Sequence, residues 1–292
     1  MKERMVGRGR DAIAMIVEPD SFQENLVGGI TMDGDFGPGA VVGTARLDGE
    51  TVTIIANDAE AVNPRFPVVY FGVIGLEEAY KMACAVYQTM EADVDQPIGR
   101  KRPLVLIVDT PGNGPGKVEE LIGMNKATGA YQLALAEARR AGHPIVAMVI
   151  GRAISGAFLC HGLQADHILA LPKEFGTVIH VMPLSSISRI TKIDAESLND
   201  LSLQSPVFAS GVEFFHRLGG VEEIVPTPQE MGPYIARHIR EIHALKKEGH
   251  FNRTGPWSRG ALGAQRGGRI ARERVLKHME AQFAPLAERY LL

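Results

Sequence analysis

The sequence predicts an α/β fold built of successive β–β–α turns, and three observations support this class. An Asp-Gly pair at Asp48 separates two alternating apolar runs, which is the strongest short-range signal of a β-hairpin. Two continuous apolar runs, at residues 104–108 and 145–150, are typical of strands buried on both faces of a parallel sheet. Strand, glycine turn and helix then recur at irregular intervals, without the G-x-G-x-x-G fingerprint of a doubly wound dinucleotide fold.

Helical and strand periodicities place the remaining elements between these runs. In chain order, the expected elements are a hairpin (40–47 and 51–56), a helix (76–89), a strand (104–108), a helix (118–141), a strand (145–150), a turn (151–156) and a short helix (157–164). The shorter elements expected after them are strands at 167–171, 177–180 and 223–225, and helices at 184–190, 195–201, 207–218 and 231–247.

The chain divides into three parts by composition. Residues 1–38 have little periodicity and are expected to form an N-terminal arm. Residues 39–250 carry the recurring strands and helices and are expected to form one α/β domain. Residues 251–292 form a C-terminal extension, with a Gly/Arg-rich link over 252–269 and a final helix over 270–292.

Composition excludes several classes of protein. The chain has 292 residues, a net charge of −3, 45% hydrophobic and 22% charged residues, which is typical of a globular protein. Aromatic residues are only 6%, so stacking platforms for single-stranded nucleic acid are not expected, and the near-neutral charge balance argues against general binding to the phosphate backbone. Two cysteines, Cys84 and Cys160, cannot build a disulfide framework, which favours a reduced cytoplasmic setting. The apolar run at residues 12–17 is too short for a signal peptide or a membrane span.

Two glycine-containing turns are candidates for binding negative charge. The turn at residues 112–116 and the turn at residues 153–157 each follow a buried strand and precede a helix. Unpaired backbone N–H groups at helix starts favour an anion, so two such turns side by side would form an oxyanion hole. The alternative is that both are tight turns that need glycine only for backbone conformation. A nucleotide phosphate loop is excluded, because Pro111 and Val118 occupy positions where that motif needs Gly and Ser or Thr.

Ser155 and His180 are the most suggestive pair of side chains. Ser155 lies at a helix entrance and His180 ends a short predicted strand, so they could act as nucleophile and base. The G-x-S-x-G elbow is absent, because Ala153 and Ala157 replace both glycines. The alternative for Ser155 is a helix N-cap. No His, Cys and Asp residues have metal-ligand spacing, so we expect no metal site.

Other polar residues near these turns have plainer interpretations. His161 and His167 flank the helix after Ser155 and are interpreted as structural, as is Cys160 inside that helix. Asp109 and Asp166, at strand ends, either orient a donor or cap turns.

One basic run lies in the C-terminal part of the chain. Its members are Arg253, Arg259, Arg266, Arg269, Arg272 and Arg274. The run is interpreted as a solvated face or a subunit contact, or as a contact for a phosphate-bearing carrier arm through Arg259, Arg266 and Arg269.

Several short motifs within residues 40–225 resemble the gamma subunit of malonate decarboxylase. They are Arg65-Phe66-Pro67, Glu91-Ala92-Asp93, Glu119-Glu120, Gly142-His143-Pro144, Ser155-Gly156-Ala157-Phe158-Leu159, His161-Gly162, Gln164-Ala165, Ile168-Leu169-Ala170-Leu171 and His180-Val181-Met182. More broadly, the chain is similar to the carboxyltransferase branch of the crotonase/Clp superfamily. In that branch, Asp109-Thr110-Pro111-Gly112 and residues 154–158 correspond to the two oxyanion turns.

The resemblance implies a ββα spiral core over residues 39–250 and a place in a hetero-oligomer. The implied partners are a related beta subunit and an acyl carrier protein that presents a malonyl thioester on a CoA-derived arm. No cofactor is expected on this chain itself. The N-terminal arm, the Arg-rich tail and the glycine-rich first turn depart from the family pattern. They leave open whether carbon dioxide is released or the carboxyl group passes to biotin on a separate carrier.

Loss of the malonyl carboxylate produces a thioester enolate, so catalysis requires stabilising an oxyanion and protonating carbon. By the resemblance, backbone N–H groups of Gly156 and Ala157, with Asn113 or Gly114, stabilise the oxyanion. Ser155 and His180 then position the carboxylate or deliver the proton.

Two other functions are consistent with the residues. A Clp-type serine peptidase would use the Ser155–His180 spacing, although the sequence around Ser155 departs from that family and no third acidic member is evident downstream. A non-catalytic subunit that completes a partner's site is the second alternative.

Overall fold

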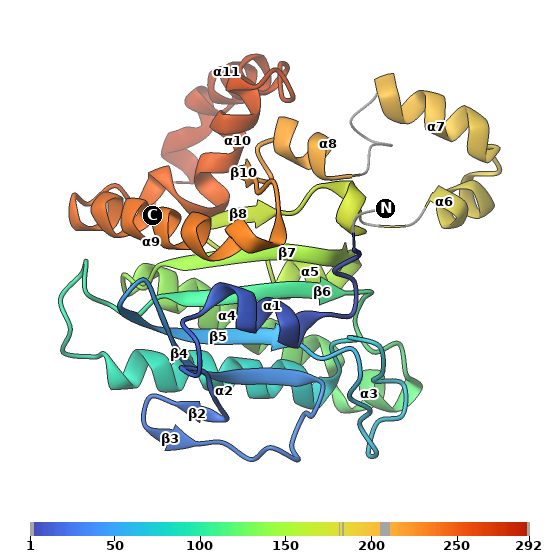
Figure 1. Cartoon of the computed structure of the whole chain (residues 1–292). Coiled ribbons are helices and arrows are strands. Elements are labelled where there is room, and N and C mark those ends of the chain that lie inside the picture. Colours follow the sequence, from blue (N-terminus) through green and yellow to red (C-terminus); the bar gives the residue numbers. More distant parts are fainter. Residues whose placement is uncertain (1–2, 181, 183, 205–210, 291–292) are drawn as a thin grey trace.

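The computed structural model describes residues 3–180, 182, 184–204 and 211–290, and its centre is an eight-stranded, mostly parallel sheet (Figure 1). The strand order is β1-β4-β5-β6-β7-β8-β10, and β9 pairs with β7 off this path. The bounds are β1 (Gln23–Glu24), β4 (Ala40–Leu47), β5 (Glu50–Asn57), β6 (Leu104–Thr110), β7 (Ile145–Ile154), β8 (His167–Ala170), β9 (Val178–His180) and β10 (Glu223–Ile224). A separate two-stranded sheet pairs β2 (Leu26–Val27) with β3 (Ile30–Thr31).

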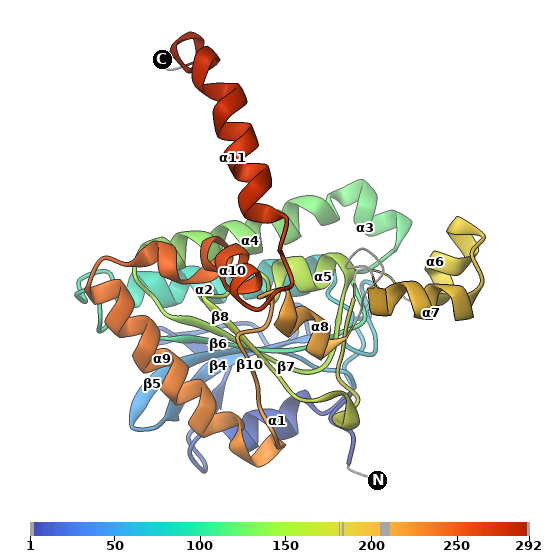
Figure 2. The same ribbon diagram turned by 90° about the horizontal axis from the view of Figure 1, so that it is seen from above.

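The helices cover both faces of this sheet. Their bounds are α1 (Gly9–Ile16), α2 (Leu76–Ala92), α3 (Lys117–Ile122), α4 (Met124–Arg140), α5 (Ser155–Cys160), α6 (Leu184–Thr191), α7 (Ala195–Gln204), α8 (Val212–Arg217), α9 (Met231–Lys247), α10 (Gly255–Gln265) and α11 (Arg272–Phe283). Short 3₁₀ turns are η1 (Lys173–Phe175), η2 (Pro228–Glu230), η3 (Phe251–Arg253) and η4 (Ala284–Arg289). Figure 2 shows α2, α4 and α5 on one face of the sheet and α1 and α9 on the other.

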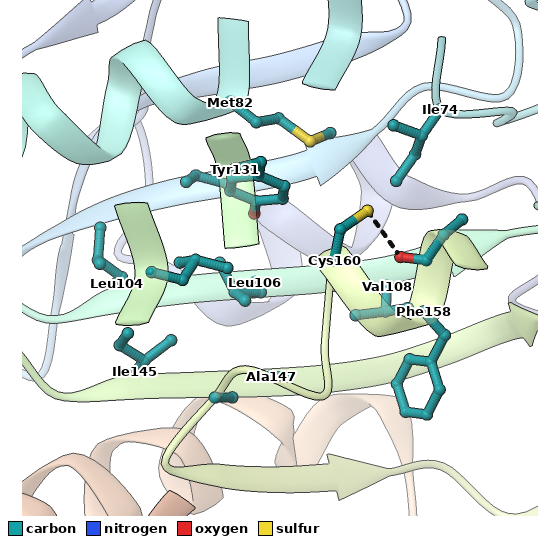
Figure 3. Close-up of a cluster of buried hydrophobic side chains, with 14 of the residues drawn as sticks. Ile74, Met82, Leu104, Leu106, Val108, Tyr131, Ile145, Ala147, Phe158 and Cys160 are labelled. Atoms are coloured by element: carbon teal, nitrogen blue, oxygen red, sulfur yellow. Dashed lines mark hydrogen bonds between the residues drawn. The ribbon is translucent and has the colours of Figure 1, made fainter. Parts of the chain in front are cut away.

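The hairpin and the buried strands agree with the sequence predictions. β4 and β5 pair antiparallel, and the left-handed φ of Asp48 (51°) and Gly49 (77°) is what a tight hairpin turn requires. In β6, Leu104 and Leu106 face the α2/α4 side (Figure 3), and Ile107 faces the α1/α9 side. Both faces are buried, so the run needs no alternation of polar residues.

Residues 1–38 are not a free arm. In α1, Ala12, Ile13 and Ile16 are buried in the same core layer as Ile107 and Ile239. The apolar spacing of these α1 residues is that of an amphipathic helix. The helix has only eight residues, so its periodicity is a weak signal in the sequence. The N-terminal segment therefore forms part of the domain's second layer.

Two predicted elements around the site have different boundaries. The helix expected over 118–141 is split into α3 and α4 at Gly123, whose φ of 120° is open mainly to glycine. The turn expected over 151–156 is replaced by a longer β7, which runs to Ile154 because Arg152 to Ile154 pair with β9, and by the start of α5 at Ser155. At Gly151, a Cβ atom would lie 2.4 Å from the Asp109 carboxylate, so glycine allows the strand to pass that side chain.

The Gly/Arg-rich link predicted over 252–269 is mostly helical. Its glycines let α10 pack closely on neighbouring backbone: a Cβ at Gly263 would lie 2.2 Å from the Leu218 carbonyl oxygen. The final helix is shorter than predicted and begins at Arg272, and α11 projects from the body of the molecule (Figure 2). The helix expected over 207–218 begins at Val212, and its first residues lie outside the described part.

Across the residues that the structure describes, we find no helix with the length and apolarity needed to cross a membrane.

Candidate active site

The two candidate turns lie side by side at the carboxyl ends of adjacent parallel strands. β6 and β7 pair in parallel from Leu104 with Ile145 to Val108 with Val149, and after a shift of register Thr110 pairs with Ala153. Figure 1 shows these carboxyl ends on the side where α6 and α7 project. Ligands bind in this position in open α/β sheets, so the two turns occupy the expected place for a shared site.

The first turn is anchored by a backbone bridge to Ile74. The Ile74 N–H donates to the Gly112 carbonyl (3.0 Å), and the Gly114 N–H donates to the Ile74 carbonyl (2.8 Å). The prediction that the Gly114 N–H serves as an oxyanion donor is therefore wrong, because this N–H already has a partner.

Asn113 joins the two turns. The Asn113 Nδ2 group is buried and lacks a hydrogen-bond partner among the described residues. A Cβ added at Gly156 would lie 2.5 Å from Asn113 Oδ1, so a larger residue there would displace the Asn113 side chain. The structure thus brings Asn113 and Gly156 together as predicted, from segments 43 positions apart, and the Asn113 side chain also lies close enough to Cys160 to offset in part the effect of burial on the pKa of that thiol.

Ser155 has an unusual backbone. It is the first residue of α5, its φ is 56°, and its side chain is exposed. It does not cap the helix: the cap position is Ile154, and no side-chain capping bond forms there. No loop separates β7 from α5, so the chain turns from the strand into the helix at Ser155. A left-handed backbone at a residue other than glycine costs about 1–2 kcal/mol. The positive φ expected near Gly156 is at Ser155 instead.

His180 reaches the same place from β9. In the β7–β9 pairing it lies opposite Ile154, immediately before Ser155 in the chain. It is half-buried, burial lowers its pKa, and its Nδ1 atom is buried without a hydrogen-bond partner in the described structure. The imidazole is therefore neutral at pH 7. Although Ser155 and His180 are neighbours, no hydrogen bond joins these two described side chains.

Asp109 and Arg152 hold the two strand ends in place. The Asp109 carboxylate accepts hydrogen bonds from the Arg152 backbone N–H (2.7 Å), from Arg152 Nε (2.8 Å) and from the Gly7 N–H (2.6 Å). The Arg152 guanidinium lies 4.0 Å from the centre of the Phe71 ring. Asp109 is thus a positioning residue, and the sequence did not reveal its partners, which come from two distant segments, at Gly7 and Arg152.

Glu119 is a buried residue beside the first turn that sequence reasoning did not single out as functional. Its side chain is 2% exposed, and its Oε1 atom has no hydrogen-bond partner in the described chain. A Cβ at Gly116 would lie 1.9 Å from Glu119 Oε2, so the carboxylate occupies the space that this glycine leaves. The glycine-rich sequence of the turn is therefore explained in part by a carboxylate packed against it.

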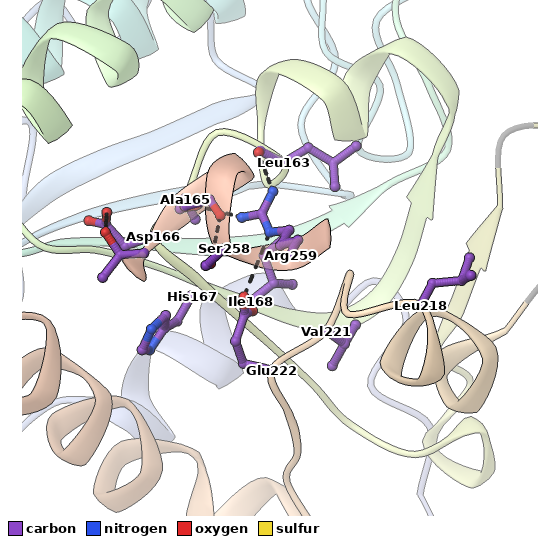
Figure 4. Close-up of polar contacts among 12 residues, drawn as sticks. Leu163, Ala165, Asp166, His167, Ile168, Leu218, Val221, Glu222, Ser258 and Arg259 are labelled. Atoms are coloured by element: carbon purple, nitrogen blue, oxygen red, sulfur yellow. Dashed lines mark hydrogen bonds and ion pairs between the residues drawn. The ribbon is translucent and has the colours of Figure 1, made fainter. Parts of the chain in front are cut away.

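The arginines proposed as carrier contacts bind backbone carbonyls instead. Arg259 is 7% exposed and donates to the carbonyls of Leu163 (2.7 Å) and Ala165 (2.5 Å), beside Glu222 (Figure 4). The prediction of a carrier contact is wrong for Arg259, because a buried guanidinium is inaccessible to a second protein.

The other two arginines differ in exposure. Arg266 donates to three carbonyls, those of His216, Val221 and Glu222. Arg269 is exposed and uses its Nε to donate to the Leu218 carbonyl (2.8 Å). A carrier contact stays a prediction for the outward-facing Arg269.

The residues interpreted as structural are satisfied in the core. Cys160 is buried, its thiol donates to the Ala157 carbonyl (Figure 3), and burial raises its pKa to about 12. His161 bonds the Tyr131 hydroxyl and the Ile107 carbonyl through its two ring nitrogens, and burial lowers its pKa to about 4.

Comparison with models of protein families assigns the chain to one family. A family model described as "Malonate decarboxylase gamma subunit" matches residues 71–283. The chain belongs to the malonate decarboxylase gamma subunit family. A relative from Malonomonas rubra, "Malonyl-S-ACP:biotin-protein carboxyltransferase MADD", is 62% identical over 290 residues, which is 99% of each chain.

Solved structures agree with this family and with the predicted fold. A chain of a Pseudomonas malonate decarboxylase hetero-tetramer in complex with coenzyme A matches with a TM-score of 0.69 and 32% identity, over 88% of this chain and 96% of that one. The transcarboxylase 12S structure matches with a TM-score of 0.62 and 22% identity, over 80% of this chain and 40% of that one, and supports the fold alone. The crotonase-like carboxyltransferase fold is therefore confirmed, as is the family resemblance.

Proposed function

We propose that this chain supplies half of a site that removes the carboxylate of a malonyl thioester carried by an acyl carrier protein. The observation that carries the proposal is the meeting of two turns at the ends of β6 and β7, where Asn113 contacts Gly156. The 62% identity to a relative named malonyl-S-ACP:biotin-protein carboxyltransferase supports a malonyl carrier thioester as the substrate and biotin on a separate carrier as the acceptor of the carboxyl group.

In the proposed reaction, the bond between the malonyl carboxylate carbon and the α-carbon breaks. Its electron pair moves onto the thioester oxygen as an enolate, and the carboxyl carbon leaves as carbon dioxide for transfer to biotin. The α-carbon then takes a proton, which gives the acetyl thioester. Stabilising the enolate oxygen is the task that the protein must perform.

The donors for this oxygen are backbone groups of the second turn. The first N–H groups of α5, including those of Gly156 and Ala157, have no intrahelical partner. The unpaired Asn113 Nδ2 adds a side-chain donor from the first turn. Each such donor is worth about 3–4 kcal/mol in the transition state.

Ser155 and His180 act on the other end of the substrate. His180 forms the last residue pair of β9 with β7, opposite Ile154, and the exposed Ser155 follows Ile154 directly, so both side chains lie beside the donors. In this position they hold the departing carboxylate or deliver the proton to carbon. A peptidase mechanism has less support, because no Ser155–His180 hydrogen bond is present to activate the hydroxyl.

A partner subunit of the beta type completes the site. Exposed apolar side chains surround the turns on this chain: Val118, Leu121 and Ile122 of α3, Leu159 of α5 and Val178 of β9. Such a patch indicates a protein interface. The related Pseudomonas protein is a hetero-tetramer solved with coenzyme A, which supports both a partner and a CoA-derived arm.

Reconstitution tests this proposal. The purified chain is expected to release little carbon dioxide from the malonyl carrier alone and to gain activity with its beta-type partner and the carriers. Full turnover by the isolated chain would contradict a shared site. A fluorophosphonate probe provides a second experiment. No labelling of Ser155 is expected, and rapid labelling would favour the peptidase alternative.

A further inference from the structure

Two histidines and a glutamate meet at the other end of the sheet from the acyl site. His167 begins β8, and His238 and Glu241 lie one turn apart on α9. One ligand atom from each of the three lies within 4.8 Å of the others. The two Nδ1 atoms are 2.8 Å apart, and His238 Nδ1 lies 4.0 Å from Glu241 Oε2.

We propose that His167, His238 and Glu241 bind a divalent transition-metal ion, with zinc as the best fit. Two imidazole nitrogens and one carboxylate oxygen are a ligand set that zinc accepts with a fourth position left to water. Imidazole ligands also favour zinc, copper or nickel over magnesium and calcium, which prefer oxygen. The sequence predicted no metal site, because the two histidines are 71 positions apart and only the fold brings them together.

Glu223 supports His238 as a ligand. His238 Nε2 lies 2.9 Å from Glu223 Oε2 and donates its proton there, which leaves a lone pair on the Nδ1 atom that faces His167. A carboxylate behind a ligating histidine is the usual outer-shell arrangement of zinc sites, because it fixes the tautomer and the ring orientation.

Charges around the cluster do not exclude a cation. Arg259 and Lys246 are basic side chains near His167. The two basic side chains are compensated: Arg259 faces Glu222 at 3.7 Å, and Lys246 bonds Asp166 at 2.6 Å. Figure 4 shows the His167 ring turned away from the Arg259 guanidinium.

A cavity gives the cluster access and room for a water ligand. It measures about 510 Å³, and its lining includes the three ligand residues together with Trp257, Gln265 and Arg266. Tetrahedral zinc with bonds near 2.1 Å needs nitrogens about 3.4 Å apart. The two rings must therefore separate by about 0.6 Å from the hydrogen-bonded position, and His167 must shift its proton to Nε2.

The proposed ion would fasten α9 and β8 at the amino end of the sheet. His167 pairs with Val146, near the start of β7, whereas the acyl site follows the end of the same strand. The metal is thus separate from the proposed decarboxylation, and failure of one proposal leaves the other intact.

Metal titration of the full chain tests the inference. The protein is stripped with a chelator and titrated with zinc against a chromophoric competitor. The expected result is one zinc per chain with a Kd below about 1 μM, weakened at least about 100-fold in His238→Gln and about 10-fold in Glu241→Gln. His243→Gln is the matched control, since His243 lies on the same helix and bonds Glu50 outside the cluster.

Two results would overturn the site. One is wild-type protein that binds zinc no more tightly than His238→Gln, which would mean a hydrogen-bonded histidine pair only. The other is an equal loss in His243→Gln. Glu241→Gln keeps the test valid if His238→Gln misfolds, because the Glu241 side chain is 54% exposed. Cobalt substitution gives an independent readout: a visible absorption band of a four-coordinate ion is expected in the wild type and should vanish in both cluster variants.

Discussion

Two groups of buried polar residues, at opposite ends of the central sheet, differ in whether they have hydrogen-bond partners. At the amino end, the buried Asp166 carboxylate accepts hydrogen bonds from Lys246 (2.6 Å), Thr254 (2.8 Å) and the Ile145 N–H (2.9 Å). At the carboxyl end, Asn113 Nδ2 and His180 Nδ1 are buried without partners in the described chain.

We interpret the paired groups as structural and the unpaired groups beside the turns as functional. Unpaired buried polar groups cost about 1–3 kcal/mol each, so those beside the two turns are candidates for pairing with a ligand or a partner. The Asp166 network joins β7, β8, α9 and the start of α10 into one unit, although His143 Nε2 and Arg259 Nε at this end are also buried without a partner in the described chain. The unsatisfied groups at the carboxyl end surround the turns where we place the substrate.

Breaking the satisfied network should produce the largest effect on stability. Lys246→Met leaves Asp166 buried and uncompensated, and we expect a loss of about 3–5 kcal/mol in the free energy of unfolding. Chemical denaturation measures it, with the exposed neighbour Lys247→Met as control. Equal losses of unfolding free energy in both variants, or no loss in Lys246→Met, would contradict the stabilising role given to the Asp166 network.

The backbone of Ser155 provides a smaller and opposite effect. Ser155→Gly relieves the left-handed φ of 56°, and we expect the free energy of unfolding to rise by about 1 kcal/mol relative to Ser155→Ala, which keeps the strain. Both variants lose the hydroxyl, so kcat should fall equally in the assembled complex. A Ser155→Gly protein no more stable than Ser155→Ala would show that the turn carries no strain.

Arg269 gives the smallest expected change. If its exposed side chain contacts a phosphate-bearing arm, Arg269→Ala raises KM for the carrier-bound substrate by up to about fivefold and leaves kcat unchanged. Steady-state kinetics of the reconstituted complex measure both constants. An unchanged KM would leave Arg269 with only its bond to the Leu218 carbonyl, a purely structural role.

Local signals account for what the sequence predicted well. The hairpin at Asp48 follows from the turn residues themselves, and α9 has the predicted bounds because its apolar spacing is continuous. The prediction failed where distant backbone decides the outcome. The Gly114 N–H is occupied by Ile74, and α10 forms because glycines such as Gly263 allow close packing.

In the candidate site, too, local sequence predicted some features and distant contacts decided the others. Sequence patterns placed Asn113, Gly156 and His180 near one another, since carboxyl ends of parallel strands share an edge. They could not reveal that Ser155 adopts the positive φ, or that Asp109 is held by Arg152, because both follow from the unexpected length of β7.

Single-turnover release of the carboxyl group from the malonyl carrier to the biotin carrier, followed as loss of the malonyl thioester in the Gly156→Val complex, tests the central claim most directly. The added side chain would collide with Asn113 Oδ1 and displace the donors, so the rate should fall by at least about 100-fold while gel filtration shows an intact complex. Gly129→Val is the control, because a Cβ at Gly129 meets nothing within 4 Å. Near wild-type release from an intact Gly156→Val complex would contradict the account and place the oxyanion elsewhere.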